Sequence, residues 1–300
     1  WFHILLCLEA QRKGMVISMK TVFDSPIEEI VKRRISVRNY VAQPLANEIK
    51  DKINEYIGRL SSPFAAQVTI KLFEAKTALN PAKLGTYGVI KGATEYIGAT
   101  VKNEEFALEA LGYEFQKLIL YITSLGLGTC WLGGTFKKGE FAKAMSVKND
   151  EIFPVISPLG FASDKRSFAD TFIRFMAQSH SRKQWDKLFF NKDFATPLSN
   201  SDAGVYSDSL EMLRLAPSAS NKQPWRIIKD GNNWHFYECK SPGYSNVLGY
   251  DIQRIDMGIA ACHFHLAAIE KRLSGEFKKL PASVVAVPKS VFYNYSWVSE

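Results

Sequence analysis

The feature that most constrains the fold is a long segment with the pattern of a buried helix. Residues 103–126, NEEFALEALGYEFQKLILYITSLGLG, offer Asn103 as a helix cap, two glutamates in the first turn and Gly126 as a stop. This helix is apolar on more than half of its circumference, so it cannot lie on a solvated surface. We therefore expect a central helix packed between other elements. Residues 256–273 predict a second buried helix of the same kind.

The sequences around these two helices resemble each other. Residues 57–75 and 212–230 both run from a helix end through a Ser/Pro/Ala loop into a strand. Within the buried helices, residues 112–126 resemble residues 256–270. The similarity predicts an internal duplication, in which two halves of the chain repeat one arrangement.

The turn-rich stretch 190–206 is the best candidate for a linker between the halves. It places the first half at residues 20–195 and the second half at residues 196–300. Residues 1–19 are expected to be an extension outside the fold. Their apolar run is too short to span a bilayer, and they lack the basic flank and cleavage site of a signal peptide.

Composition limits the classes of function. The 300 residues are 46% hydrophobic and 23% charged, as in an ordinary globular protein. The net charge of +8 favours anionic partners, but the basic residues are scattered and no nucleic-acid-binding motif accompanies them. The four cysteines show no CxxC pairing, which favours a reducing compartment. We expect a cytoplasmic protein with a small-molecule substrate and neither a nucleic-acid nor a membrane partner.

The segment RRISVRNY at residues 33–40 is suited to binding a phosphate. Arg34, Ser36 and Arg38 occupy alternate positions where a helix gives way to extended chain, so they share one side. Two guanidinium groups flanking a hydroxyl offer paired, planar donors to a phosphate. The alternative is a basic helix end that complements the helix dipole in solvent.

Two further segments could approach a flat ligand. LGLGTCWLGGTF at residues 125–136 has glycines that allow close backbone approach, but it follows a helix and is not GxGxxG, which disfavours a Rossmann site. PSASNKQPW at residues 217–225 supplies short polar side chains, including Asn221 with both donor and acceptor groups. The alternatives are a helix cap with a tight loop for the first, and a plain turn before an edge strand for the second.

Together the three segments resemble the FMN-dependent nitroreductase family. The family's Arg-x-Ser-x-Arg-x-aromatic signature corresponds to residues 34–40, and its Pro-Ser-x-x-Asn-x-Gln-Pro-Trp loop corresponds to residues 217–225. Its Leu-Gly-Leu-Gly segment corresponds to residues 125–128. The resemblance covers about residues 20–300. It implies an α+β, nitroreductase-like fold of two diverged α/β halves, with antiparallel-rich sheets packed around central buried helices.

One departure from the family sets this chain apart. The ordinary family forms dimers, in which one chain gives the Arg signature to a flavin and its partner gives the Asn loop. Here the signature lies in the first half and the loop in the second, about 180 residues later. The first half has Ala66 where the Asn would fall, and the second half has no Arg signature. The chain therefore resembles a single-chain branch of the family, a monomer that acts as an intramolecular pseudo-dimer with one surviving site.

The resemblance also implies roles for particular residues. Arg34 and Arg38, assisted by Ser36, would bind the phosphate, ribityl chain and pyrimidine oxygens of FMN, and Asn221 would reach the polar edge of the ring. Gly133 stands where the ordinary family has a carboxylate near the flavin N5, so only backbone chemistry is expected there. The implied FMN-binding set is Arg34, Ile35, Ser36, Arg38, Trp131, Leu132, Gly133, Gly134, Lys165, Arg166, Pro217, Ser218, Ala219 and Asn221.

The implied activity is that of an FMN-dependent NAD(P)H oxidoreductase. NADH or NADPH would be the transient electron donor, and a nitroaromatic, quinone or similar compound the acceptor, with no side-chain acid or base demanded. The alternative is a flavin-binding or sensing protein without turnover. A hydrolase is disfavoured because GxSxG is absent. A metal site is disfavoured because Cys262, His263 and His265 would point in different directions on a helix.

Overall fold

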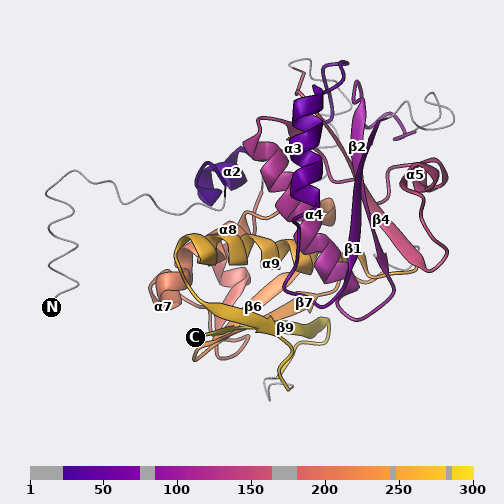
Figure 1. Ribbon diagram of the computed structural model, residues 1–300. Helices are drawn as coiled ribbons and strands as arrows, with labels where there is room; N and C mark the ends of the chain where they lie inside the picture. Colours follow the sequence, from indigo (N-terminus) through magenta and orange to yellow (C-terminus); the bar gives the residue numbers. More distant parts are fainter. Residues whose placement is uncertain (1–22, 75–84, 164–180, 244–247, 282–285) are drawn as a thin grey trace, which may run out of the picture.

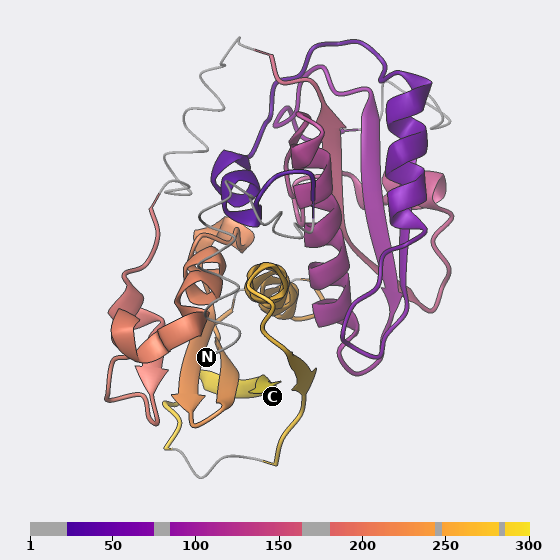
Figure 2. The same cartoon turned by 60° about the vertical axis from the view of Figure 1, so that its left-hand side comes forward.

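Two sheets lie on either side of two long central helices (Figure 1, Figure 2). The computed structural model describes residues 23–74, 85–163, 181–243, 248–281 and 286–300. The central helices are α4 (Ala107–Ser124) and α9 (Ile252–Glu270). Both are buried along most of their length, which confirms the prediction made from their apolar circumference. The layers run first sheet, α4, α9, second sheet.

The first sheet is antiparallel throughout and packs one face against α4. Its other face is covered by α5 (Lys138–Met145), whose Phe141 ring packs edge-on against Phe73 and Tyr96. Side chains alternate between the faces because a strand has a period of two. In sheet order the strands are β1 (Val68–Glu74), β2 (Glu95–Lys102), β4 (Glu151–Gly160) and β3 (Gly128–Thr129).

The second sheet packs against α9, where Phe264 meets Phe236 edge-on at a centroid distance of 5.5 Å. Its first pair of strands is parallel and the other pairs are antiparallel. The predicted hairpin is confirmed, with Gly231 in the turn at φ +58°. In sheet order the strands are β5 (Phe189–Asn191), β6 (Trp225–Asp230), β7 (Asn233–Cys239), β9 (Val291–Ser299) and β8 (Gly275–Lys278).

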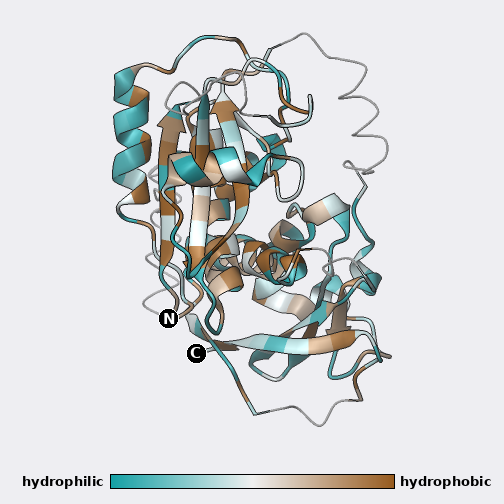
Figure 3. Cartoon of the chain, turned by 90° about the vertical axis from the view of Figure 1, so that its right-hand side faces the viewer, coloured by the Kyte–Doolittle hydropathy of each residue, from teal (hydrophilic) through white to brown (hydrophobic). Residues whose placement is uncertain are grey.

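Shorter helices complete the described part of the chain. On the first half, the Tyr56 ring of α3 stacks on Tyr121 of α4 at 3.8 Å. Hydrophobic residues gather on the strands and the central helices (Figure 3). None of the described helices is long and apolar enough to cross a membrane. The shorter helices are α2 (Ile27–Arg33), α3 (Asn47–Ile57), η3 (Trp185–Lys187), α7 (Asn200–Ala203), η4 (Gly204–Tyr206), α8 (Ser207–Arg214) and η5 (Ala219–Asn221).

The stretch chosen as the linker contains ordered elements. β5, which ends at Asn191, pairs with β6, and α7 and η4 occupy residues 200–206. Residues just before position 196 therefore belong to the second sheet. The division into 20–195 and 196–300 stays a prediction, and residues 1–19 lie outside the described part of the chain.

The central helices cross with almost no side-chain volume between them. A Cβ atom added at Gly112 would lie 2.1 Å from the carbonyl oxygen of Ile255, and one added at Gly258 would lie 2.0 Å from the carbonyl oxygen of Glu109. The contact is reciprocal, because each glycine faces the carbonyl three residues before the other glycine. It relates Gly112 to Gly258, whereas the sequence similarity aligns residue 112 with residue 256.

We expect Gly258→Ala to destabilise the protein by about 1–3 kcal/mol, because the added methyl group overpacks the crossing. Gly139→Ala is the matched control: Gly139 is an exposed residue of α5, with no atom within 4 Å of its added Cβ. There the substitution should stabilise by about 0.5–1 kcal/mol through helix propensity. Urea unfolding of both variants checks the pair. Equal effects of the two substitutions would contradict the tight crossing.

Candidate functional site

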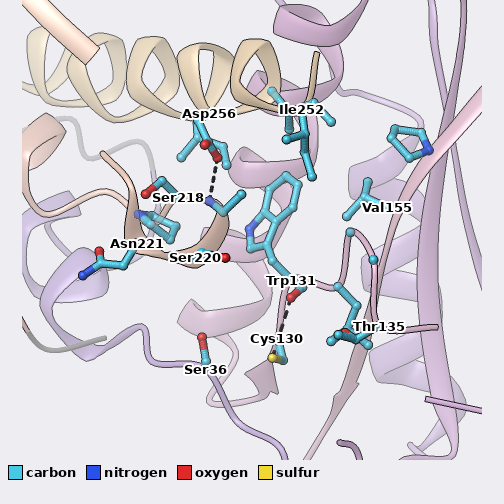
Figure 4. A pocket seen from close by; sticks show the side chains of 18 of the residues that line it. Ser36, Cys130, Trp131, Thr135, Val155, Ser218, Ser220, Asn221, Ile252 and Asp256 are labelled. Atoms are coloured by element: carbon cyan, nitrogen blue, oxygen red, sulfur yellow. Dashed lines mark hydrogen bonds between the residues drawn. The ribbon is translucent and has the colours of Figure 1, made fainter. Parts of the chain in front are cut away.

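A cavity of about 450 Å³ opens where the segments after α2 and β3 face the loop before β6 and the start of α9 (Figure 4). Its walls come from the chain after α2, the segment after β3, two residues of β4, the loop before β6 and the first turns of α9. The lining residues are Arg34, Ser36, Arg38, Val89, Cys130, Trp131, Leu132, Gly133, Gly134, Thr135, Pro154, Val155, Arg182, Pro217, Ser218, Ala219, Ser220, Asn221, Ile252, Ile255, Asp256 and Ile259.

Most residues of the implied FMN-binding set line this one cavity. All of the described members do so except Ile35, which is 48% exposed and not among the lining residues. The reason is the alternation of the extended chain, which turns Arg34, Ser36 and Arg38 to the cavity and Ile35 away from it. Lys165 and Arg166 lie outside the described residues.

The segment that carries the arginines is held by pairing with β3. Helix α2 ends at Arg33, and Arg34 is already extended, with φ −62° and ψ 116°. Ser36 then bridges Thr129 in parallel, and the Val37 amide donates to the Thr129 carbonyl at 2.8 Å. Val37 packs over Gly128, where an added Cβ would lie 2.7 Å from its methyl group. Any larger residue at Gly128 would push the arginine segment away.

The cavity carries an excess of positive charge. Arg34, Arg38 and Arg182 line it, and Arg34 Nε has no hydrogen-bond partner in the described structure. Burial, with a contribution from the Arg182 charge, lowers the pKa of Arg34 to about 10. The one carboxyl among the described lining residues is Asp256, whose pKa burial raises well above its usual range. The site is therefore suited to an anion.

The loop before β6 is held in a left-handed conformation. Ser220 and Asn221 have φ of 47° and 54°, and the Ser218 hydroxyl accepts a hydrogen bond from the Gln223 amide at 2.8 Å. The Ala219 amide donates to Asp256 Oδ1 at 2.9 Å. Trp225, at the start of β6, is fully buried and anchors the loop in the core.

The side chain of Asn221 is already engaged at the edge of the cavity. Its Nδ2 donates to the carbonyl of Ser181 at 2.9 Å, and its Oδ1 accepts from Arg182 and from Gln223 Nε2, each at 3.2 Å. A ligand that bonds to Asn221 must share or replace these contacts.

Trp131 is fixed by a buried polar network that joins both central helices. Its indole Nε1 donates to Gln116 Oε1 at 2.9 Å, and Gln116 Nε2 donates to His263 Nε2 at 2.8 Å. The other ring nitrogen of His263 donates to the Met212 carbonyl at 2.9 Å. Burial lowers the pKa of His263 to about 3, so the ring is neutral. Figure 4 shows the Trp131 ring reaching into the cavity from the segment after β3.

The second histidine of the CHFH segment is also engaged, since His265 Nδ1 lies 2.8 Å from the Tyr113 hydroxyl. Over the described ranges no group of three or more His, Cys, Asp or Glu is placed to hold a metal ion.

Sequence reasoning missed half of the lining residues. Cys130, Thr135 and Ser220 lie inside segments that it had singled out, so proximity in sequence could have found them. Asp256 begins the second predicted helix, but nothing in that pattern indicates its direction. Arg182 lies in none of the segments that the sequence patterns singled out for ligand binding, so nothing in the sequence indicated it as a lining residue. The other missed residues, Val89, Pro154, Val155, Ile252, Ile255 and Ile259, are apolar wall residues.

Comparisons with known proteins identify the fold. A "putative nitroreductase" of Thermotoga maritima MSB8 is 20% identical, and the match covers 91% of this chain and 93% of that chain with a TM-score of 0.58. This likeness confirms the predicted α+β, nitroreductase-like fold. No curated protein matches the chain.

Weaker likenesses extend over about half of the chain. A "putative nitroreductase" of Desulfovibrio desulfuricans in complex with FMN is 21% identical and covers 49% of this chain and 95% of that one, with a TM-score of 0.37. An FMN-dependent nitroreductase of Clostridium difficile R20291 is 18% identical and covers 46% and 88%, with a TM-score of 0.39.

The family described as "Putative TM nitroreductase" matches residues 26–268, which is most of the chain. The chain therefore belongs to this nitroreductase family, as the resemblance in its sequence predicts.

Proposed function

We propose that this protein is an FMN-binding oxidoreductase of the nitroreductase type. It would pass reducing equivalents from NADH or NADPH through FMN to a nitroaromatic, quinone or similar acceptor. One observation carries the proposal: the Arg segment at 34–38, the glycine segment at 131–134 and the Asn loop at 217–221 line a single cavity, although they are far apart in the chain. Membership of the nitroreductase family supports the same activity.

The residues of the cavity fit the chemistry of FMN. The volume of about 450 Å³ lies in the range of small-molecule sites. The unpartnered Nε of Arg34 and the surplus of guanidinium groups suit a phosphate. Beside them, an added Cβ at Gly134 would meet no atom within 4 Å, and one at Gly133 would lie 2.9 Å from Ile252 Cδ1. Gly134 therefore leaves its backbone open to a flat ring, whereas the missing side chain of Gly133 makes room for Ile252.

FMN, when bound, supplies the electron-transfer chemistry, and the chain supplies binding and orientation. In this proposal Arg34 and Arg38 hold the phosphate, ribityl chain and pyrimidine oxygens, while the loop at 217–219 covers one face of the ring. The pairing of Ser36 with Thr129 and the anchoring of Trp225 keep the two sides in register. The isoleucines of α9 line the same cavity. A ring packed against them would exclude water, and each polar contact to the ligand would then be stronger. Lys165 and Arg166 stay predicted phosphate ligands.

The activity is tested by the spectrum of the purified protein. We expect a yellow protein, or one that becomes yellow with added FMN, that NADPH or NADH bleaches and a nitroaromatic re-oxidises. Colour without bleaching would point to a flavin-binding protein without turnover. A colourless protein that FMN cannot reconstitute would overturn both functions.

We expect substitutions on the two sides of the cavity to weaken the same FMN site. Arg34→Ala should weaken FMN binding by about tenfold to a hundredfold, because it removes charge-assisted hydrogen bonds. Asn221→Ala should weaken it by about threefold to tenfold, because a neutral hydrogen bond is worth less. Quenching of flavin fluorescence measures both. Arg33→Ala is the control, since Arg33 is exposed and donates to the Thr123 carbonyl outside the cavity. Unchanged affinity in either cavity variant refutes the shared site.

We also expect one FMN per chain and a monomer in solution. In the similarity between residues 57–75 and 212–230, Phe64 falls where the second half has Ala219. The Phe64 ring is buried and packs against Phe277 and Tyr295 at centroid distances of 5.7 and 5.0 Å. The Phe64 side chain thus fills the place that corresponds to Ala219, which in the proposed site covers one face of the flavin ring. Calorimetric titration with FMN, together with light scattering for the mass, checks this, and two flavins per chain would contradict it.

A further inference from the structure

Asp256 is a buried carboxyl group at the wall of the cavity. It lies in the second turn of α9 and is 2% exposed. Its Oδ1 accepts the hydrogen bond from the Ala219 amide at 2.9 Å, and Figure 4 shows this bond beside the Trp131 ring. Its Oδ2 is buried and has no hydrogen-bond partner in the described structure. A buried oxygen of this kind is costly unless it finds a partner.

The charges around Asp256 do not favour a carboxylate. Asp251, the N-cap of α9, acts on it as a negative neighbour, and Glu238 of β7 does so when ionised, although burial raises the pKa of Glu238 itself to about 8. The nearby cations are committed elsewhere: Lys240 pairs with Asp251 at 2.6 Å, and Arg254 pairs with Glu109 at 2.7 Å. Within the described ranges Asp256 forms no ion pair.

Among the described residues, three arginines that line the cavity are further cations near Asp256: Arg34, Arg38 and Arg182. Arg182 donates hydrogen bonds to the carbonyl of Leu215 and to Asn221, and the charges that act on the Asp256 carboxyl are those of Glu238 and Asp251 and not those of the three arginines. Burial and the two acidic neighbours raise the pKa of Asp256 well above its usual range. A neutral carboxylic acid has one O–H donor, and Oδ1 is already used as an acceptor.

We propose that Asp256 carries a proton on Oδ2 and donates a hydrogen bond from it to an acceptor atom of the ligand in the cavity. The ligand class is then a flat heteroaromatic ring that places an anionic group at the arginines and a neutral oxygen or nitrogen acceptor at Asp256. This inference rests on the proposed function, because FMN is the ligand of that class used to test it. The cavity would then offer the ligand a protonated acid from Asp256, in addition to the backbone groups at Gly133.

Infrared difference spectra of wild type against Asp256→Asn test the proposal directly. Asn keeps an acceptor for the Ala219 amide and a donor at the second position, so the loop should stay in place. At pH 7 the ligand-free wild type should show a carboxylic-acid C=O band that the variant lacks, and FMN should shift that band. Absence of the band in the ligand-free protein, or a band that stays unchanged when FMN is bound, overturns the proposal.

A stability measurement tests the proton without any ligand. A raised pKa in the folded state means that the folded chain keeps a proton which the unfolded chain loses above its ordinary pKa of about 3.9. The stability of the wild type relative to Asp256→Asn should therefore fall as the pH rises from 5 to 8. A difference that is flat or rises with pH overturns the proposal. If FMN does not bind to the wild type, the proposed function fails, while the ligand-free band and the pH dependence still decide whether Asp256 holds the proton.

Discussion

The arrangement of the molecule depends on how closely α4 and α9 approach each other at Gly112 and Gly258. Because no side chain separates the backbones there, the flanking polar groups come within bonding distance. Glu109, with no exposed surface, receives two hydrogen bonds from Arg254 at 2.7 and 3.0 Å. Each sheet packs against its own helix, so the crossing also sets the distance between the two sheets. The cavity takes its walls from both sides of the crossing and depends on the same approach.

The charge distribution in the cavity explains why a ligand of one sign is favoured. Burial, with a smaller contribution from the Arg182 charge, disfavours the charged form of Arg34, which is why its pKa falls to about 10. A carboxylate in the wall would neutralise that charge and weaken the attraction for an anion. Asp256 avoids this effect because burial and its acidic neighbours favour its neutral form. The ligand-free cavity therefore holds positive charge that a bound phosphate would stabilise.

Sequence patterns predicted the fold and much of the cavity lining, and the reasons are local. Two helices that are apolar on most sides have to be buried, and alternate positions in an extended chain have to share a side, as Arg34, Ser36 and Arg38 do. Asp256 and Arg182 could not be predicted in this way. Their directions depend on the crossing angle of the helices and on the path of residues 181–183, which are tertiary properties. The side contacts of Asn221 arise from the same packing.

The two loops that the sequence similarity relates differ in a way that bears on the number of sites. At Ala219 a small side chain leaves space beside α9, and its amide is held by a carboxyl that only the second long helix supplies. At the related position the Phe64 side chain occupies the corresponding space, and its ring also packs against Phe106 and Tyr113. Refilling that place with a ligand would require removing a buried aromatic side chain, which costs about 3–5 kcal/mol in a core. The loop at Ala219 therefore lines a cavity, whereas the similar loop at Phe64 is part of an aromatic cluster.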